Sequence, residues 1–387
     1  MKVLITGGGT GGHVFPAIAV AEALQRLNPQ AEILFVGGAH GLEATAVPQA
    51  GFAFHAVPAR SLIGRRLLAL PAALWTTLRG LIASVRILRR FRPDVVFATG
   101  GYVSGPVALA ATLQGRPVVL HEQNTIPGLT NRLLSRIARE VHVSDPGSRR
   151  FFPRRRHLKL SGNPVRPNVI QGDPQRAMRE WQLERGRRTV LVLGGSQGAR
   201  SINRAAVSAV RRLAERTDLQ FVLQTGPRDQ GWVARKLQPV TLPVRVLAFI
   251  QRMGDAYRAA DLVISRAGAM TLAELAVCGK AAILVPYPHA ARNHQERNAR
   301  ALVEGGAAEM ILDRELNGRR LAASIVKMID TPRKLREMSH NALRRARPDA
   351  ARKIAAALLR YGTGEGESGS EGEGAAHETP TRKEGRR

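Results

Sequence analysis

The sequence has very little cysteine, since its 387 residues include only Cys278. A lone cysteine excludes an internal disulfide and is compatible with a reducing compartment, so the cytosol is the expected location. The sequence also lacks a charge-free, glycine-poor apolar run of about 18 residues, and the apolar run after Lys2 is too short for a signal-peptide core. No segment is therefore predicted to span a membrane.

Aromatic residues and negative charge are also scarce. Aromatics make up 4% of the chain, and 59 Lys and Arg outnumber 30 Asp and Glu, which gives a net charge of +29. So basic a chain predicts a polyanionic partner. Because aromatics are few and no recognised nucleic-acid-binding motif is present, we do not expect nucleic acid. The remaining candidates for the polyanionic partner are an anionic membrane and a phosphorylated substrate.

An acidic residue is missing where a dinucleotide site would need one. Residues 3–6 predict a strand, residues 7–16 (GGGTGGHVFP) a glycine turn, and residues 17–27 a helix. Such a turn at a helix N-terminus suits a phosphate. Its glycine spacing also fits a dinucleotide site, which takes the ribose with an acid at the end of the next strand. The first acid after that strand is Glu43, in a predicted loop, so we expect neither NAD nor a flavin.

The same pattern begins again halfway along the chain. Residues 189–193 predict a strand, residues 194–199 (GGSQGA) a glycine loop, and residues 200–214 a helix. Strands and helices alternate after both loops, which is typical of parallel sheets with right-handed crossovers. The sequence therefore predicts two Rossmann-like, doubly wound α/β domains that face each other across a cleft.

The second half contains the residues that indicate which kind of ligand the protein binds. After a predicted strand at 261–265, Arg266 and the amides of a following helix would suit a diphosphate. Thr271 and Glu274 match a capping box, a purely structural role, although Glu274 one turn into the helix would also reach a ribose. The amides in residues 293–298 (NHQERN) suit a sugar, because they both donate and accept hydrogen bonds. These features predict a nucleotide-diphosphate-sugar site.

Seven ordered blocks carry a resemblance to a known family: GGTGGHVFPA, GGYVSGP, HEQN, GNPVR, GGSQGA, SRAGAMTLAE and PYPHAARNHQERNA. In this order they resemble the MurG family, the UDP-N-acetylglucosamine transferases of peptidoglycan synthesis. The resemblance implies a GT-B glycosyltransferase. Its members move GlcNAc from UDP-GlcNAc to the C4 hydroxyl of undecaprenyl-diphosphate-MurNAc-pentapeptide (lipid I), giving lipid II with inversion. A related GT-B enzyme that makes another glycolipid is the alternative.

The domain boundaries expected on this basis follow the chain. We expect an acceptor- and membrane-side domain at residues 1–162 and a donor-side domain at residues 163–345. A helix at residues 346–361 is expected to pack back on the first domain. The remaining residues, 362–387, are rich in Gly and Glu and predict a disordered tail.

The resemblance also implies which residues bind the donor. Glu274 would hold the ribose, while Thr271 and Ser196 would meet the diphosphate. Asn124 and Gln295 would hold the sugar. His294 departs from the family pattern, because some members have a second Gln there. The full set implied is Thr10, Gly11, Gly12, Asn124, Arg166, Ser196, the backbone of Ile250, Ala269, Met270, Thr271, Leu272, Ala273, Glu274 and Gln295.

Inverting transfer needs a base that removes the acceptor proton. His13 is the first candidate, because a helix N-terminus disfavours the imidazolium and keeps the ring neutral. The alternative is that His13 caps the loop or hydrogen-bonds the acceptor diphosphate. Glu122 is the second candidate, although it could equally be structural. The sequence has no Asp-x-Asp motif, so we expect no metal and no other cofactor.

One segment of the first half predicts contact with a membrane. Residues 60–92 mix Leu, Ile, Val and Trp75 with many arginines, and residues 149–156 (RRFFPRRR) have the same character. A core-facing helix with a solvated basic side is the alternative. An apolar face rimmed by Arg suits an interfacial anchor, so we expect a peripheral protein on the cytoplasmic face of the bacterial cell membrane. The expected contacts are the apolar part of residues 62–88 with Arg65, Arg66, Arg79, Arg86, Arg132 and Arg136.

Overall fold

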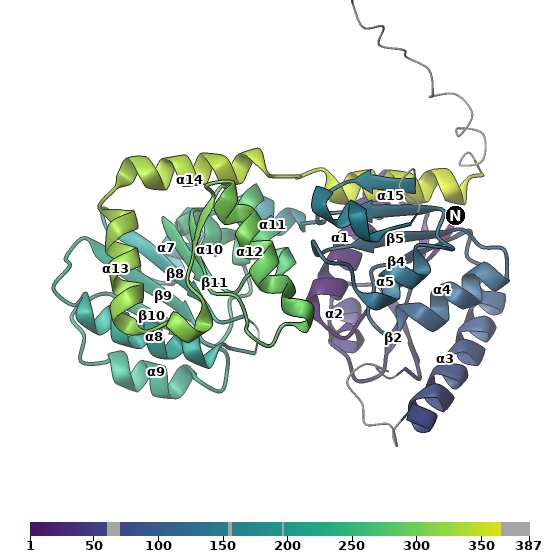
Figure 1. Ribbon diagram of the computed structural model, residues 1–387, viewed down its shortest axis with the longest axis horizontal. Coiled ribbons are helices and arrows are strands. Elements are labelled where there is room, and N and C mark those ends of the chain that lie inside the picture. The colour runs from purple at the N-terminus through teal and green to yellow at the C-terminus, as the bar shows by residue number, and fades with distance from the viewer. Residues whose placement is uncertain (60–69, 154–156, 196, 365–387) are drawn as a thin grey trace, which may run out of the picture.

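The computed structural model describes residues 1–59, 70–153, 157–195 and 197–364. These residues form two parallel sheets, one in each half of the chain (Figure 1). The first sheet contains β1 (Lys2–Thr6), β2 (Glu32–Gly38), β3 (Ala53–Val57), β4 (Val95–Ala98), β5 (Val118–Glu122), β6 (Glu140–Val143) and β7 (Leu158–Leu160). The second contains β8 (Arg188–Leu193), β9 (Leu219–Gln224), β10 (Val244–Leu247), β11 (Leu262–Ser265), β12 (Ala282–Leu284) and β13 (Ala308–Met310).

Both sheets are built in the same way. The strand order is β3-β2-β1-β4-β5-β6-β7 in the first and β10-β9-β8-β11-β12-β13 in the second, and the paired strands are parallel. The order reverses between β1 and β4 and again between β8 and β11. In open parallel sheets, ligands bind beyond the carboxyl ends of the strands at such a switch point.

Helices cover both faces of each sheet, as expected for parallel strands buried on both sides. Each sheet lies between two apolar cores. This confirms the predicted fold class of two Rossmann-like, doubly wound domains. The helices of the first half are α1 (Gly11–Leu27), α2 (Glu43–Gln49), α3 (Leu70–Phe91), α4 (Ser104–Leu113), α5 (Leu129–Leu134) and the 3-10 turn η2 (Pro146–Phe151).

The second half has more helices, and its last one returns to the first sheet. They are α6 (Pro167–Ile170), α7 (Pro174–Glu180), α8 (Arg200–Arg212), α9 (Gln230–Leu237), α10 (Met253–Ala259), α11 (Ala269–Val277), η4 (Ala291–Asn293), α12 (His294–Glu304), η5 (Asp313–Glu315), α13 (Gly318–Ile329), α14 (Pro332–Arg344) and α15 (Ala350–Gly362).

The helix α1 begins earlier than the sequence predicted, at Gly11 rather than residue 17. The two glycines and Pro16 hid its first turn, because these residues weaken or interrupt helices when judged by propensity alone. Burial compensates: Val14, Ile18 and Val20 are at most 2% exposed. The consequence is that His13 lies inside the first turn of a helix.

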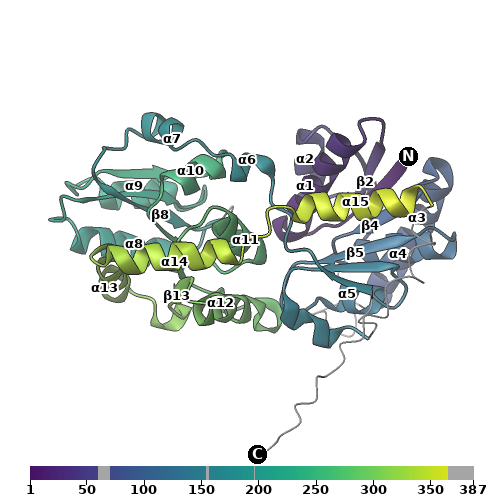
Figure 2. The same cartoon turned by 90° about the horizontal axis from the view of Figure 1, so that it is seen from above.

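The last helix joins the two halves. Figure 2 shows α14 along the second domain and α15 along the first, with a short connection between them. α15 packs against α1, and its buried Ala351, Ile354, Ala355 and Leu358 belong to the core that α1 forms on the first sheet. The chain therefore crosses between the sheets twice, once after β7 and once after α14.

We expect Ile354→Ala to destabilise the protein by about 2–5 kcal/mol, because it removes a fully buried side chain from this core and leaves a cavity. Urea unfolding would measure the loss. Lys353→Ala, at an exposed position on the same helix, is the control and should change stability by no more than about 0.5 kcal/mol. Equal effects of the two changes would contradict the packing described for α15.

Candidate active site

Two glycine loops meet at the switch point of the first sheet. One follows β1 and the other follows β4, and Gly9 and Gly101 have φ angles of +87° and +85°, which favour glycine. A Cβ on Gly101 would lie 2.4 Å from the carbonyl oxygen of Gly8. The two loops therefore pack backbone against backbone, and a side chain at this position would separate them.

A buried carboxylate holds the first of these loops. Glu43 begins α2 and is 1% exposed, and it accepts hydrogen bonds from the backbone N–H of Gly9 (3.0 Å) and of Gly38 (2.9 Å). The sequence placed this acid in a loop, whereas the structure places it in contact with the glycine turn. Glu43 occupies the Gly9 amide, so an external anion would have to use the amides at the start of α1.

His13 lies in the first turn of α1, and its hydrogen bonds define its tautomer. Its Nδ1 is 2.9 Å from the carbonyl oxygen of Thr99 and 3.1 Å from Oε1 of Gln123. Both partners are acceptors, so Nδ1 carries the proton and donates. In the neutral ring, Nε2 then keeps its lone pair.

A second histidine fixes the orientation of Gln123. Burial lowers the pKa of His121 to about 3, so this ring is neutral. Its Nε2 donates to the carbonyl oxygen of Gly162 (3.1 Å), which leaves Nδ1 to accept from Nε2 of Gln123 (3.1 Å). Nε2 of Gln123 also donates to the carbonyl oxygen of Thr99 (2.8 Å), so Oε1 of Gln123 faces His13.

Glu122, the second candidate base, has its oxygens occupied. Oε1 accepts from the backbone N–H and from Nδ2 of Asn124, at 2.9 and 3.3 Å. Oε2 accepts from the backbone N–H of Gly128 (3.1 Å) and from Nδ2 of Asn131 (2.9 Å), and the residue is 1% exposed. Glu122 thus ties the loop that contains Asn124 to the end of β5.

In the second domain, the N-terminus of α11 lies at the switch point, after β11. The N-cap residue is Gly268, and no side chain caps the helix. The predicted capping box of Thr271 and Glu274 is therefore wrong, because the helix starts two residues before Thr271. Backbone amides of the first turn have no acceptor within an α-helix, so this end can bind an anion.

Glu274 is instead half-buried in the second turn of α11. Its Oε2 accepts a hydrogen bond from the Tyr257 hydroxyl at 2.9 Å. Burial raises the pKa of Glu274, while the Tyr257 hydroxyl and the charge of Arg166 partly oppose this. Arg166 follows β7 and places its guanidinium over the ring of Phe15 in α1, 4.8 Å from the ring centre. Arg166 thereby connects the first domain with the neighbourhood of Glu274.

Arg266, which the sequence assigned to the diphosphate site, has partners within its own domain. Its Nη1 lies 2.6 Å from Oδ1 of Asp313, and its Nη2 donates to Oγ of Ser201 at 2.9 Å. This ion pair neutralises the charge of Arg266, which the sequence analysis had assigned to a bound diphosphate. The amides of α11 remain as the anion-binding groups of this end.

The other expected donor contacts are distributed over both domains. Thr10 is exposed and is the N-cap of α1, followed by the half-buried Gly11 and Gly12. The backbone N–H of Ile250 donates to Oε1 of Gln224 (3.3 Å), and Oε1 of Gln295 accepts from the backbone N–H of Tyr287 (3.0 Å). Ser196 lies outside the described residues.

Direct hydrogen bonds close the two domains against each other. Asn298 of α12 accepts from the backbone N–H of Thr125 and donates to Oδ1 of Asn124, both at 3.3 Å. Nδ2 of Asn163 also donates to the carbonyl oxygen of Ala269 in the second domain (3.3 Å). Sequence reasoning included Asn298 among the amides that suit a sugar but did not foresee its contacts with the first domain, and it missed Tyr257. The only signal for Asn298 was its place in the amide-rich run, and Tyr257 gave none.

Comparison with known proteins identifies relatives of the whole chain. Residues 3–143 match the glycosyltransferase family 28 N-terminal domain, and residues 189–354 match the glycosyltransferase family 28 C-terminal domain.

Among the described residues, no group of three or more His, Cys, Asp or Glu could hold a metal ion.

Two curated relatives carry the same name, UDP-N-acetylglucosamine–N-acetylmuramyl-(pentapeptide) pyrophosphoryl-undecaprenol N-acetylglucosamine transferase. The protein from Thermodesulfovibrio yellowstonii is 44% identical over 364 residues, which cover 93% of this chain and 99% of the relative. The one from Moorella thermoacetica is 45% identical over 366 residues, with the same coverage. The crystal structure of Acinetobacter baumannii MurG is similar with a TM-score of 0.73 at 30% identity, covering 93% of this chain and 99% of that one.

We expect Glu274→Gln to stabilise the protein, and more so at higher pH. The raised pKa means that the unfolded chain releases this proton at a lower pH than the folded chain. The natural protein therefore loses stability as the pH rises above about 4.5, and an uncharged amide removes that loss. Urea unfolding at about pH 5 and about pH 8 would measure the difference.

Glu304→Gln, at an exposed position on α12, is the matched control and should leave the pH dependence of stability unchanged. If Glu274→Gln gave the same stability difference at both pH values, the raised pKa of the Glu274 carboxyl in the folded protein would be refuted.

Proposed function

The chain belongs to glycosyltransferase family 28 and, within it, to the MurG family, and from this membership we propose how its residues perform the reaction. It is an N-acetylglucosamine transferase that uses UDP-GlcNAc and converts lipid I to lipid II. Its GT-B fold matches that of the MurG structure. The proposal concerns the site residues, the stereochemistry and the membrane surface.

We place the donor in the second domain, against α11. The first-turn amides of Ala269, Met270 and Thr271 face the diphosphate, and Glu274 binds the ribose. Support comes from the N-terminus of α11 at the switch point and from the carboxylate one turn further on. The uracil lies against the backbone of Ile250. Leu272 and Ala273 continue the helix that holds these groups in position.

The sugar lies where the two domains meet. Asn124 and Gln295 contact its hydroxyls, and the hydrogen bonds between Asn124, Thr125 and Asn298 support this placement because they join the two domains there. Thr10, Gly11 and Gly12 approach from the start of α1, and Arg166 lies between α1 and Glu274.

His13 acts as the general base. The observation that carries this role is the pair of acceptors at Nδ1, which leaves Nε2 able to take a proton. Nε2 removes the proton from the C4 hydroxyl of MurNAc while that oxygen forms a bond to the anomeric carbon of GlcNAc. The bond from this carbon to the UDP phosphate breaks on the opposite face, so the configuration inverts.

The departing UDP carries the developing negative charge. The helix N-terminus of α11 stabilises that charge through amides that are already in place, so no side chain has to move during the reaction. Glu122 has a positioning role here, because its oxygens hold the Asn124 loop.

We place the membrane against α3, α4 and α5, which pack side by side (Figure 1). Among the described residues, eight of the fourteen exposed large hydrophobic side chains lie on these helices or just after α5. They are Trp75, Leu78, Ile82, Leu109, Leu113, Leu129, Leu133 and Ile137. Apolar side chains of this kind can enter the interface of a bilayer.

Arginines accompany this apolar surface. Arg79, Arg86 and Arg136 are exposed and Arg132 is half-buried, whereas Arg65 and Arg66 lie outside the described residues. Each such charge near an anionic leaflet contributes about 1 kcal/mol. No helix of the described chain is long and apolar enough to serve as a membrane span. A peripheral position on the cytoplasmic face fits an acceptor that is anchored in the same leaflet.

The reaction is tested by UDP release from UDP-GlcNAc, with and without a short-chain lipid I analogue and in the presence of a chelator. Release that depends on the acceptor and persists in chelator is the expected result. Donor binding without acceptor-dependent release would assign the protein to a different glycolipid acceptor.

We expect His13→Ala to lower kcat by roughly 10²- to 10⁴-fold and to change the KM for UDP-GlcNAc by less than about threefold, because the base acts on the acceptor only in the transition state. Steady-state UDP release measures both constants. Glu122→Gln serves as the comparison. It should raise the KM for UDP-GlcNAc and lower kcat less than His13→Ala does, because it loosens the Asn124 loop.

A kcat for His13→Ala within a few-fold of the natural protein would refute the base assignment. A kcat loss for Glu122→Gln larger than that for His13→Ala would move the role of base to Glu122.

We expect Leu133→Gln to weaken binding to vesicles that contain anionic phospholipid by roughly tenfold, because it removes a leucine that would enter the interface. Sedimentation with vesicles measures the binding, which should also weaken with added salt. Leu343→Gln is the matched control: Leu133 is 54% exposed and Leu343 is 50% exposed, but Leu343 lies on α14 of the second domain. Similar losses for the two variants would contradict the proposed membrane surface.

A further inference from the structure

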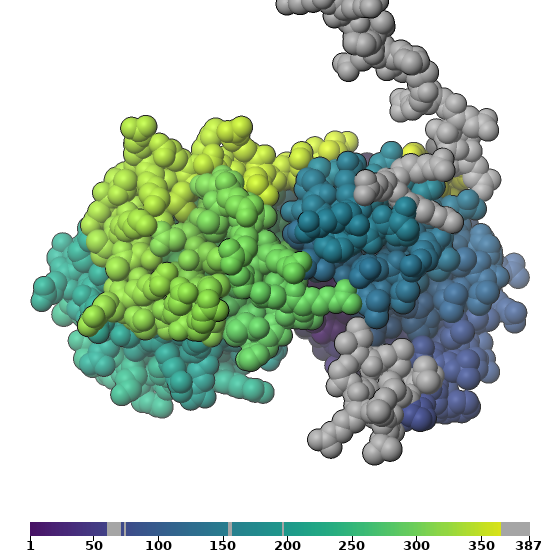
Figure 3. Space-filling model, in the orientation of Figure 1, coloured from purple at the N-terminus to yellow at the C-terminus, as the bar shows by residue number. Residues whose placement is uncertain are grey.

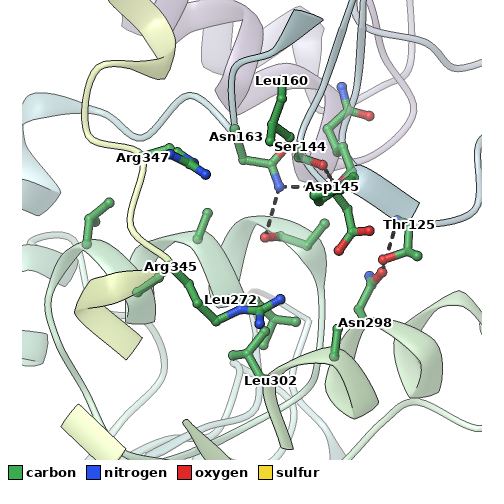
Figure 4. A pocket seen from close by; sticks show the side chains of 18 of the residues that line it. Thr125, Ser144, Asp145, Leu160, Asn163, Leu272, Asn298, Leu302, Arg345 and Arg347 are labelled. Carbon is green, nitrogen blue, oxygen red and sulfur yellow. Dashed lines mark hydrogen bonds between the residues drawn. The ribbon is translucent and has the colours of Figure 1, made fainter. Parts of the chain in front are cut away.

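A cavity of about 290 Å³ lies between the two domains, beside both crossings of the chain (Figure 4). The first crossing contributes Gly162 and Asn163, and the second contributes Arg345 and Arg347. A Cβ at Gly162 would lie 2.4 Å from Cβ of Arg347, so the two crossings pack directly against each other. We call this space the hinge cavity.

The hinge cavity and the donor use different faces of one helix. Leu272, Ala273 and Ala276 of α11 line the cavity, and with Ala269 they follow the spacing of a single helix face. Glu274 points elsewhere, to the Tyr257 hydroxyl. The cavity therefore lies on a different face of α11 from Glu274, and it borders the proposed sugar position through Thr125 and Asn298.

A buried polar atom in the wall of the hinge cavity has no partner. Asn163 is 8% exposed, and its Nδ2 donates to the carbonyl oxygens of Gln123 (3.1 Å) and Ala269 (3.3 Å). Because both partners are acceptors, the orientation of the amide is determined. Its Oδ1 accepts no hydrogen bond from any described residue. This oxygen has almost no exposed surface, so it stays unsatisfied within the wall, at a cost in free energy.

The charges around the hinge cavity are mostly positive. Arg344, Arg345 and Arg347 line it, and none of them forms an ion pair within the described part of the chain. Figure 4 shows Arg345 and Arg347 on one side and Asp145 on the other. Guanidinium groups bind phosphate and carboxylate oxygens through paired hydrogen bonds. The alanine and leucine side chains between them can contact the apolar part of a ligand.

We propose that the hinge cavity is a binding site for a small organic anion, a phosphate ester or a carboxylate. The anionic group binds the three arginines that line the cavity. The volume lies at the small end of the range of roughly 300–1,000 Å³ for ligand pockets, which fits a molecule smaller than a nucleotide sugar.

Occupancy of this site tightens donor binding. The walls come from both domains, so a ligand in the cavity favours their closed arrangement, and Asn163 in the wall donates to the carbonyl oxygen of Ala269 at the first turn of α11. Coupling between two sites is reciprocal, so UDP tightens the binding of the anion by the same factor.

Calorimetry on the full chain tests the site with two probes, glycerol 3-phosphate for the phosphate class and the dipeptide Ala-Glu for the carboxylate class. We expect at least one to bind with a dissociation constant of about 1 mM or tighter. Saturating UDP occupies the catalytic cleft during a second titration. Binding in the hinge cavity should then be at least about fivefold tighter, whereas binding in the cleft would be abolished.

Arg345→Ala and Arg347→Ala change exposed side chains and should each weaken the probe about tenfold while UDP still binds in the absence of the probe. Arg336→Ala, an exposed arginine on α14 that does not line the cavity, is the matched control. The proposal is overturned if neither probe binds, if UDP displaces the probe, if UDP leaves its affinity unchanged, or if all three variants bind it equally.

Discussion

The close approach of two glycine loops at the first switch point determines the geometry of the catalytic centre. A Cβ on Gly7 would lie 1.8 Å from Oγ1 of Thr99, and that hydroxyl donates to the carbonyl oxygen of His13 at 2.9 Å. The carbonyl oxygen of Thr99 accepts from the His13 ring. The end of β4 therefore holds both the backbone and the imidazole of His13. It can do so only because glycine leaves room, so the glycines also help to set the tautomer of His13, the base that we propose.

A buried neutral histidine, His121, also controls the hydrogen bonds around His13. His121 is neutral because burial makes its charged form costly, and neutrality lets it both donate and accept within one chain of hydrogen bonds. A charged ring would donate from both nitrogens and would force the amide of Gln123 to turn. The low pKa of one histidine thus sets the proton position on another, although the two rings share no hydrogen bond.

The fold could be predicted from the sequence because alternation and glycine loops are local signals. The site could be predicted only in part. The loops, His13 and Glu122 follow strand ends, where a ligand is expected, but the roles of Glu43, Arg266 and Glu274 depend on partners distant in sequence. Asp313, which neutralises Arg266, comes from another segment of the domain. Tyr257, which meets Glu274, lies on α10, and no spacing rule connects it to α11. The capping box failed because the helix already begins after Gly268, where the chain leaves β11, which places Thr271 inside the first turn.

In the proposed mechanism the two domains supply different groups to the proton transfer. His13, in the first turn of α1, accepts a proton. Once it accepts one, the imidazolium is stabilised by the carbonyl oxygen of Thr99 and by Oε1 of Gln123, while the positive end of α11 stabilises the departing diphosphate. In this proposal the first domain stabilises the positive charge that forms on His13, and the second domain stabilises the negative charge of the departing diphosphate. Asn163 and Asn298 hold the two domains together, so both charges are stabilised in the same transition state.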